Sequence, residues 1–116
     1  MSAIVVSEEL LSEAKNFLDI SWKDDATDQK LKGEIRRGVA YITEKTGVKA
    51  SVFSGEDVND RAQTLLFNYL LYSRAGALDQ FYLNYAFELN SLRRRTRVAA
   101  AREEKNETRT EGGGLP

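Results

Sequence analysis

AQTLLFNYLLYSRAGALDQFYLNYAFELNSL, residues 62–92, is the stretch that decides the fold. Before Gly76, apolar side chains fall on nearly every side of a helix, which indicates a buried helix. After Gly76, one helical stripe comprises Leu78, Phe81, Tyr82, Tyr85, Leu89 and Leu92. Leu83 and Phe87 point roughly 140 to 180° away from that stripe. This second apolar direction needs a cover, so we expect Leu83 and Phe87 to lie in a subunit interface.

Upstream of this stretch, two more amphipathic helices are predicted. The first runs from about Glu8 to Leu18, with Ser7 as its N-cap. Asp25, with Asp28 three residues later, is the predicted cap of the second helix. This helix runs to about Thr46, and Gly47 fits the left-handed position after its end. Gly38 lies close to the apolar stripe of the second helix, which predicts close packing against a neighbouring helix.

The predicted fold is therefore all-α, a small bundle of four main helices. Residues 48–57 form a loop with a short extended piece, and Phe53 folds back onto the core. The third helix runs from about Val58 to Arg74 with Asp57 as its cap, and the fourth runs from about Leu78 to at least Arg93.

Length and composition limit the function. A chain of 116 residues, 41% hydrophobic and 30% charged, is one globular domain with one core. It has no Cys and no His, which excludes thiolate and imidazole metal sites, Ser-His-Asp and Cys-His triads, and disulfides. We expect no catalytic residues, no enzyme activity, no metal and no cofactor. Neither a signal peptide nor a membrane span is apparent.

Charge divides the chain into two parts. From Arg93 onward there are seven basic and four acidic residues, a net charge of +3, which leaves −4 in the remainder. We expect residues 1–95 to form the helical domain and residues 96–116 to form a C-terminal arm that is flexible until it docks. No large apolar residue lies between Val98 and Leu115, so the arm cannot bury itself.

Four segments, in this order and spacing, resemble the head-to-tail connector proteins of tailed phages, also called adaptor or head completion proteins. They are SEELLSEAKNFLDI (7–20), SWKDDATDQKL (21–31), YITEKTGV (41–48) and LLFNYLLYSRAGALDQFYLNYAFELNSL (65–92). The likeness covers about residues 8–95 and leaves out the tail.

The resemblance implies a homo-oligomeric ring, dodecameric in the family, under the portal protein of a filled capsid. Such a ring extends the DNA channel without sequence-specific DNA binding and provides the docking surface for a stopper or tail completion protein. It has no membrane partner. The implied location is the head-tail interface of the virion, with the host cytoplasm as the site of assembly. The segment Arg93, Arg94, Arg95, Arg97 and Val98 is the expected portal-docking arm.

Other readings of these motifs stay open. The arginines could instead neutralise nucleic-acid phosphates, or they could be solvent-exposed and interact favourably with the helix dipole. The principal alternative function is a small DNA-binding or regulatory helical protein that uses the basic arm. Trp22 is either a lid over the core or an exposed anchor for a partner. Tyr69, Tyr72, Tyr82 and Tyr85 are expected in the core and interface rather than in a ligand pocket. Asp24, Asp25 and Asp28 fit helix capping better than a calcium loop.

Overall fold

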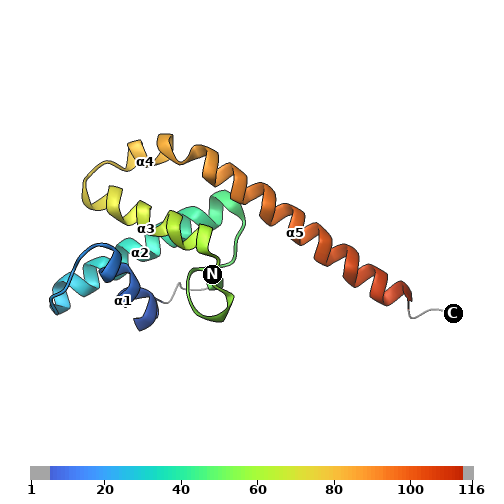
Figure 1. The fold of residues 1–116 in the computed structure, drawn as a ribbon, viewed down its shortest axis with the longest axis horizontal. Helices are drawn as coiled ribbons and strands as arrows, with labels where there is room; N and C mark the ends of the chain where they lie inside the picture. The colour runs from blue at the N-terminus through green and yellow to red at the C-terminus, as the bar shows by residue number, and fades with distance from the viewer. Residues whose placement is uncertain (1–5, 114–116) are drawn as a thin grey trace.

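The computed structural model describes residues 6–113, with side chains described for residues 6–106. Every regular element in this range is a helix, so the predicted all-α class is confirmed (Figure 1). The elements are α1 (Glu8–Phe17), α2 (Asp25–Thr46), two 3-10 turns η1 (Ala50–Phe53) and η2 (Gly55–Asp57), α3 (Asp60–Arg74), α4 (Leu78–Asn84) and α5 (Ala86–Gly113).

The centre of the core is the packing of α3 against α2. A Cβ added at Gly38 of α2 would lie 2.7 Å from Leu66 Cδ1 and 2.9 Å from Tyr69 Cδ1. Only glycine permits this approach, which confirms the predicted role of Gly38. The apolar stripes of both helices are buried here; they comprise Leu31, Ile35, Val39, Ile42, Ala62, Leu65, Leu66, Tyr69 and Leu70.

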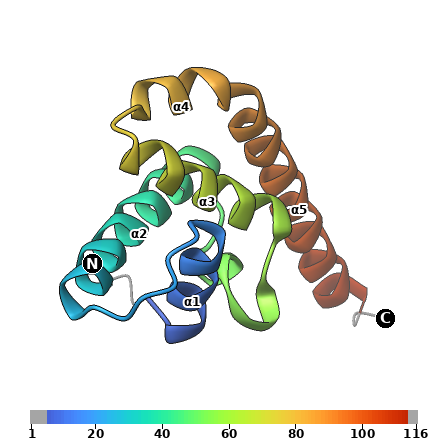
Figure 2. The same ribbon diagram turned by 60° about the vertical axis from the view of Figure 1, so that its left-hand side comes forward.

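The first helix packs on this centre as its sequence predicts. The Leu10 N–H donates to Ser7 Oγ at 3.1 Å, which confirms Ser7 as the N-cap. Leu10, Leu11 and Ala14 are buried. Gln63 Nε2 of α3 donates to Glu13 Oε2 at 2.6 Å and joins the two helices. Figures 1 and 2 place α1 and α4 on opposite sides of α3.

Two of the predicted N-cap residues are wrong. The N-cap of α2 is Asp24, one residue before the expected position, because its carboxylate accepts hydrogen bonds from both the N–H and the hydroxyl of Thr27. The N-cap of α3 is Asn59 and not Asp57. Asn59 donates its own N–H to the Val52 carbonyl at 2.7 Å, which holds it extended and delays the helix.

The segment before α3 also differs from the prediction. In place of a short extended piece, residues 50–57 form the turns η1 and η2. Phe53 is nevertheless fully buried, as expected, and its carbonyl accepts a hydrogen bond from Gln63 Nε2 at 3.0 Å. Gly47 has a φ of 80° at the end of α2, which confirms the left-handed cap.

The predicted fourth helix is two helices, because the helical conformation is interrupted at Tyr85. Tyr85 has φ −110° and ψ 11°, outside the α-helical geometry. Its ring stacks on Phe81 at 4.9 Å and meets Tyr72 edge-on at 5.8 Å. We attribute the break to this aromatic packing. The change of direction between α4 and α5 is visible in Figures 1 and 2 and brings Leu89 and Leu92 of α5 into the core.

The C-terminal arm is helical up to Gly113 and continues α5 without interruption; residues 114–116 lie outside the described residues. The boundary expected between residues 95 and 96 therefore falls inside one helix. Ala, Glu, Arg and Lys have high helix propensity, which accounts for the continuation. Leu92 is the last buried residue, and the described side chains from Arg97 to Asn106 are all exposed. This half of α5 projects from the body (Figure 1).

Candidate functional site

Among the side chains that the structure describes, the most exposed large apolar ones belong to α4 and α5. Leu83 and Phe87, which we call the outer apolar pair, are each 73% exposed. Leu83 lies two positions after Phe81, which is fully buried, so it points to the opposite side of α4. Phe87 lies two positions before the buried Leu89 and likewise points outward. The two apolar directions expected from the sequence are thus present, and the second has no cover within the described residues.

Beside Phe87, a groove of about 290 Å³ separates the start of α3 from the start of α5. We call it the α3–α5 groove. Its lining is mostly apolar, from Leu65, Tyr85, Phe87 and Leu92, and also includes polar residues: Asp60, Arg61, Thr64, Glu88 and Ser91. No sequence motif predicted this groove, because its two walls come from different helices.

The four arginines expected in the docking arm are all exposed but do not form one patch. Arg93 and Arg97 line a surface groove beside the end of α2, together with Glu44. Arg95 lines a different groove, whose lining also includes Asp60. Arg94 lines neither of these grooves. Because successive residues turn by roughly 100° on a helix, a basic run in the sequence becomes a basic collar around α5. Val98 is 49% exposed on the same helix.

Trp22 lies on the loop between α1 and α2 and is 52% exposed. This exposure leaves about half of the side chain accessible to a partner. The loop, residues 18–24, is fixed at both ends. At its start, Asp19 has a left-handed φ of 58°, and the Ile20 N–H donates to the Lys15 carbonyl at 2.9 Å while Ile20 is buried. This is the hydrogen bonding of a Schellman helix end.

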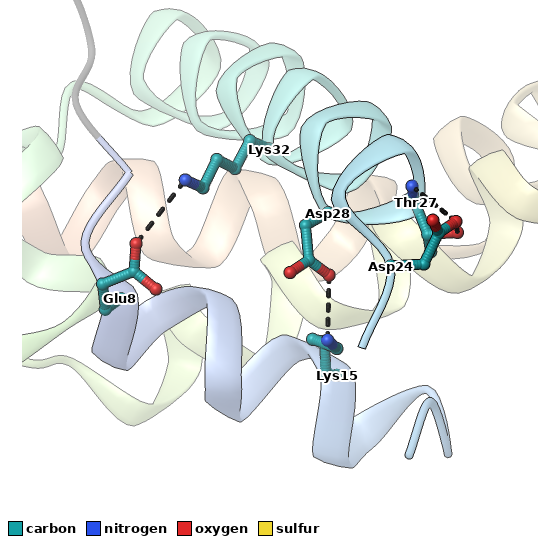
Figure 3. A network of polar contacts seen from close by, with 6 residues as sticks. All are labelled: Glu8, Lys15, Asp24, Thr27, Asp28 and Lys32. Atoms are coloured by element: carbon teal, nitrogen blue, oxygen red, sulfur yellow. Dashed lines mark hydrogen bonds and ion pairs between the residues drawn. The ribbon is translucent and has the colours of Figure 1, made fainter. Parts of the chain in front are cut away.

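A polar network fixes the other end of the loop (Figure 3). The Asp24 carboxylate caps α2 by accepting hydrogen bonds from the hydroxyl and the N–H of Thr27. The bond from the hydroxyl is the main reason that the pKa of Asp24 is below its usual value, and the bond from the N–H adds to it. Lys15 Nζ lies 2.8 Å from Asp28 Oδ1 and joins α1 to the first turn of α2. Asp24 and Asp28 are thus engaged in capping and pairing. No group of carboxylates that could hold a metal ion occurs among the described residues.

The tyrosines lie mainly in an aromatic cluster around Phe81, whose ring centroid lies within 6.4 Å of those of five neighbouring tyrosines: Tyr41, Tyr69, Tyr72, Tyr82 and Tyr85. Burial raises the pKa of Tyr41, Tyr69 and Tyr85 above the usual tyrosine value. Tyr69 is buried, Tyr72 and Tyr85 are half-buried, and Tyr82 is exposed. The predicted tyrosine stripe therefore extends from the core, at Tyr69, to the surface, at Tyr82.

One buried charged residue was not anticipated. Glu34 of α2 is 5% exposed, and its Oε2 has no hydrogen-bond partner among the described residues. The one signal in the sequence is its position a single helical turn before Gly38. A buried acceptor without a partner lowers stability.

Replacing Glu34 by methionine, which has a similar shape, is expected to raise the free energy of unfolding by about 1 kcal/mol, because it removes the unpaired buried oxygen. Urea denaturation at neutral pH measures the change. The matched control is Glu44→Met on the exposed surface of the same helix, with an expected change below about 0.5 kcal/mol. A loss of stability in Glu34→Met would show that Glu34 has a stabilising partner.

Comparison with known proteins adds no relative. No protein-family model matches the chain, and no curated protein or solved structure is significantly similar to it. Within the described part of the chain, none of the helices combines the length and the apolar character that crossing a bilayer requires. Function is therefore argued from the surfaces described above.

Proposed function

We propose that the chain is a structural adaptor of a tailed phage, not an enzyme, which assembles as a ring between the portal protein and the tail. The observation that carries this proposal is the outer apolar pair, Leu83 and Phe87, at 73% exposure each. Exposed apolar surface bordered by polar side chains marks protein-binding sites, and Phe87 of the pair also lines the mostly apolar α3–α5 groove. The sequence resemblance to the connector family agrees with a covered surface of this kind.

In this proposal the body forms the ring and the basic collar of α5 contacts the portal. A ring requires every copy to use two different surfaces, one for each neighbour. The outer apolar pair supplies one of these surfaces. The basic collar of α5 supplies guanidinium groups that suit carboxylates and backbone carbonyls of a portal subunit. The opposite side of the ring would receive the stopper or tail completion protein, and DNA would pass through the channel.

Replacing both Leu83 and Phe87 by aspartate is expected to abolish ring assembly on portal-bearing capsids. Burying one such side chain contributes about 1.5–3 kcal/mol, so losing two should weaken the contact at least about 100-fold. The isolated chain should keep its melting temperature, because both positions are exposed. Co-sedimentation of the chain with capsids measures the binding.

The control for this variant is Gln80→Glu with Asn90→Asp. It adds the same two negative charges at exposed polar positions on α4 and α5, so binding to capsids should be retained. Binding of the Leu83→Asp, Phe87→Asp chain at the level of the natural chain would contradict the proposed subunit face.

The basic collar is tested by changing Arg93, Arg94, Arg95 and Arg97 together to glutamine. Binding to the isolated portal protein should weaken about 10-fold or more and become less dependent on salt, because charge-assisted hydrogen bonds to the portal are lost. Arg102→Gln with Lys105→Gln, farther along α5, is the matched control. Unchanged portal binding would mean that the collar is exposed to solvent and does not contact the portal.

The same variant separates the adaptor from the alternative DNA-binding function. Filter binding of duplex DNA is measured at increasing salt. A steep loss of DNA affinity with salt in the natural chain, absent from the glutamine variant, would favour a DNA-binding protein. No DNA binding at low salt removes that alternative.

A further inference from the structure

Trp22 is presented to solvent by a loop that is already fixed in place. Buried Ile20 holds one end of the loop, and the Asp24 cap with the Lys15–Asp28 ion pair holds the other (Figure 3). An exposed tryptophan on a rigid loop loses little conformational freedom on binding. Tryptophan is also the side chain most often found at the energetic centre of protein interfaces. The loop thus has the properties of an anchor.

The α3–α5 groove has the size and chemistry of a receptor for such a side chain. Its volume of about 290 Å³ is large enough to admit one indole ring. Leu65, Tyr85 and Leu92 offer apolar and aromatic contacts inside it. Phe87 belongs both to the groove and to the outer apolar pair. The groove therefore continues the subunit face proposed above.

The polar groups also match. Asp60 and Glu88 place carboxylates beside the apolar interior, and Arg61 lies with them. A carboxylate can accept the hydrogen bond that a buried indole N–H requires. Lys23, next to Trp22 in the sequence, carries the opposite charge. Within the described part of the chain, none of Asp60, Glu88 and Lys23 forms an ion pair, so these charges are available to a neighbour.

The two surfaces cannot meet within one chain. Figures 1 and 2 both place the loop between α1 and α2 at one end of the body and the starts of α3 and α5 toward the other. We infer that Trp22 of one copy inserts into the α3–α5 groove of the next copy. A contact between two different surfaces is heterologous and forms a ring when its rotation closes. The inference rests on the proposed adaptor function and supplies its second subunit surface.

Cross-linking tests the contact directly, because the natural chain has no cysteine. Full-length Lys23→Cys and Thr64→Cys chains are mixed and oxidised in two settings. In the first the chains are bound to portal-bearing capsids, and in the second they are free in solution at millimolar concentration. A disulfide between the two variants is expected in at least one of these settings. Ala40→Cys mixed with Thr64→Cys places the cysteine at an exposed position about four turns along α2 from the loop, and should give none. Absence of the Lys23–Thr64 product in both settings overturns the inference.

The fluorescence of Trp22 gives a second readout, since it is the only tryptophan in the chain. Association should shift its emission to shorter wavelength, and Trp22→Ala should weaken association about 30-fold, as for a hot-spot residue. Thr64→Phe, which fills the groove, should prevent the emission shift. Association with the emission of an exposed indole would overturn the inference.

The outcomes also separate this inference from the proposed function. Copies that bind the portal as a ring but give no cross-link retain the adaptor and refute the Trp22 contact. A cross-linked oligomer that does not bind portal-bearing capsids retains the Trp22 contact and refutes the adaptor.

Discussion

Replacing Phe81 by alanine is expected to lower the free energy of unfolding by about 3–5 kcal/mol, the usual loss for a phenylalanine removed from a core. Phe81 is fully buried and is the common neighbour of the aromatic cluster that joins α2, α3 and α4 to Tyr85, the residue between α4 and α5. Its removal leaves a cavity and frees Tyr85, whose stacking on Phe81 accompanies the break between α4 and α5. Urea denaturation followed by circular dichroism measures the loss.

The matched control is Leu83→Ala, two positions away on α4. Leu83 is mostly exposed, so its removal should change the free energy of unfolding by less than about 0.5 kcal/mol. Similar losses in both variants would mean that the assigned facing of α4 is wrong.

Replacing Gly38 by alanine should destabilise the chain by about 1–3 kcal/mol, the range for overpacking a well-filled core. The added methyl group would lie 2.7 Å from Leu66 Cδ1 and 2.9 Å from the Tyr69 ring, so α2 and α3 must separate or the two side chains must shift. Alanine is the better helix former by up to about 1 kcal/mol, and this gain offsets only part of the loss. The midpoint of urea unfolding reports the net effect.

Gly33, five residues earlier on α2, is the control for this change. The nearest atom to a Cβ at Gly33 is the end of the Arg37 side chain at 3.5 Å, which can move. Gly33→Ala should therefore raise the free energy of unfolding by up to about 1 kcal/mol. Opposite signs at Gly38 and Gly33 are the expected result, and a gain at both positions would contradict the close approach of α2 and α3.

Much of the fold could be predicted because local rules and packing agree. Ser7 and Gly47 are residue types that favour helix caps, and each caps a helix. Phe53 is the one aromatic residue in its loop, and it is buried in the core. The division at Tyr85 could not be predicted, since neither glycine nor proline marks it. It depends on the rings of Phe81 and Tyr72, which only the tertiary structure brings there.

The candidate surfaces were predictable to a similar degree. Helical periodicity alone placed Leu83 and Phe87 outward, and both are exposed. The run of arginines from Arg93 to Arg97 suggested one patch, but the turn of the helix distributes the side chains around its axis. The α3–α5 groove and the burial of Glu34 could not be predicted, because each depends on how elements distant in the sequence pack together.

The unbroken course of α5 through the expected domain boundary has a mechanical consequence. Residues 97–113 form a rod of about 25 Å, at roughly 1.5 Å per residue, anchored through Leu89 and Leu92. Because the helix has a fixed rise and turn per residue, its length sets both the distance and the rotation about the axis of any group bound at its far end. Inserting one residue would advance that end by only about 1.5 Å but swing it by roughly 100°, so the number of residues in this spacer determines the direction in which a bound partner faces.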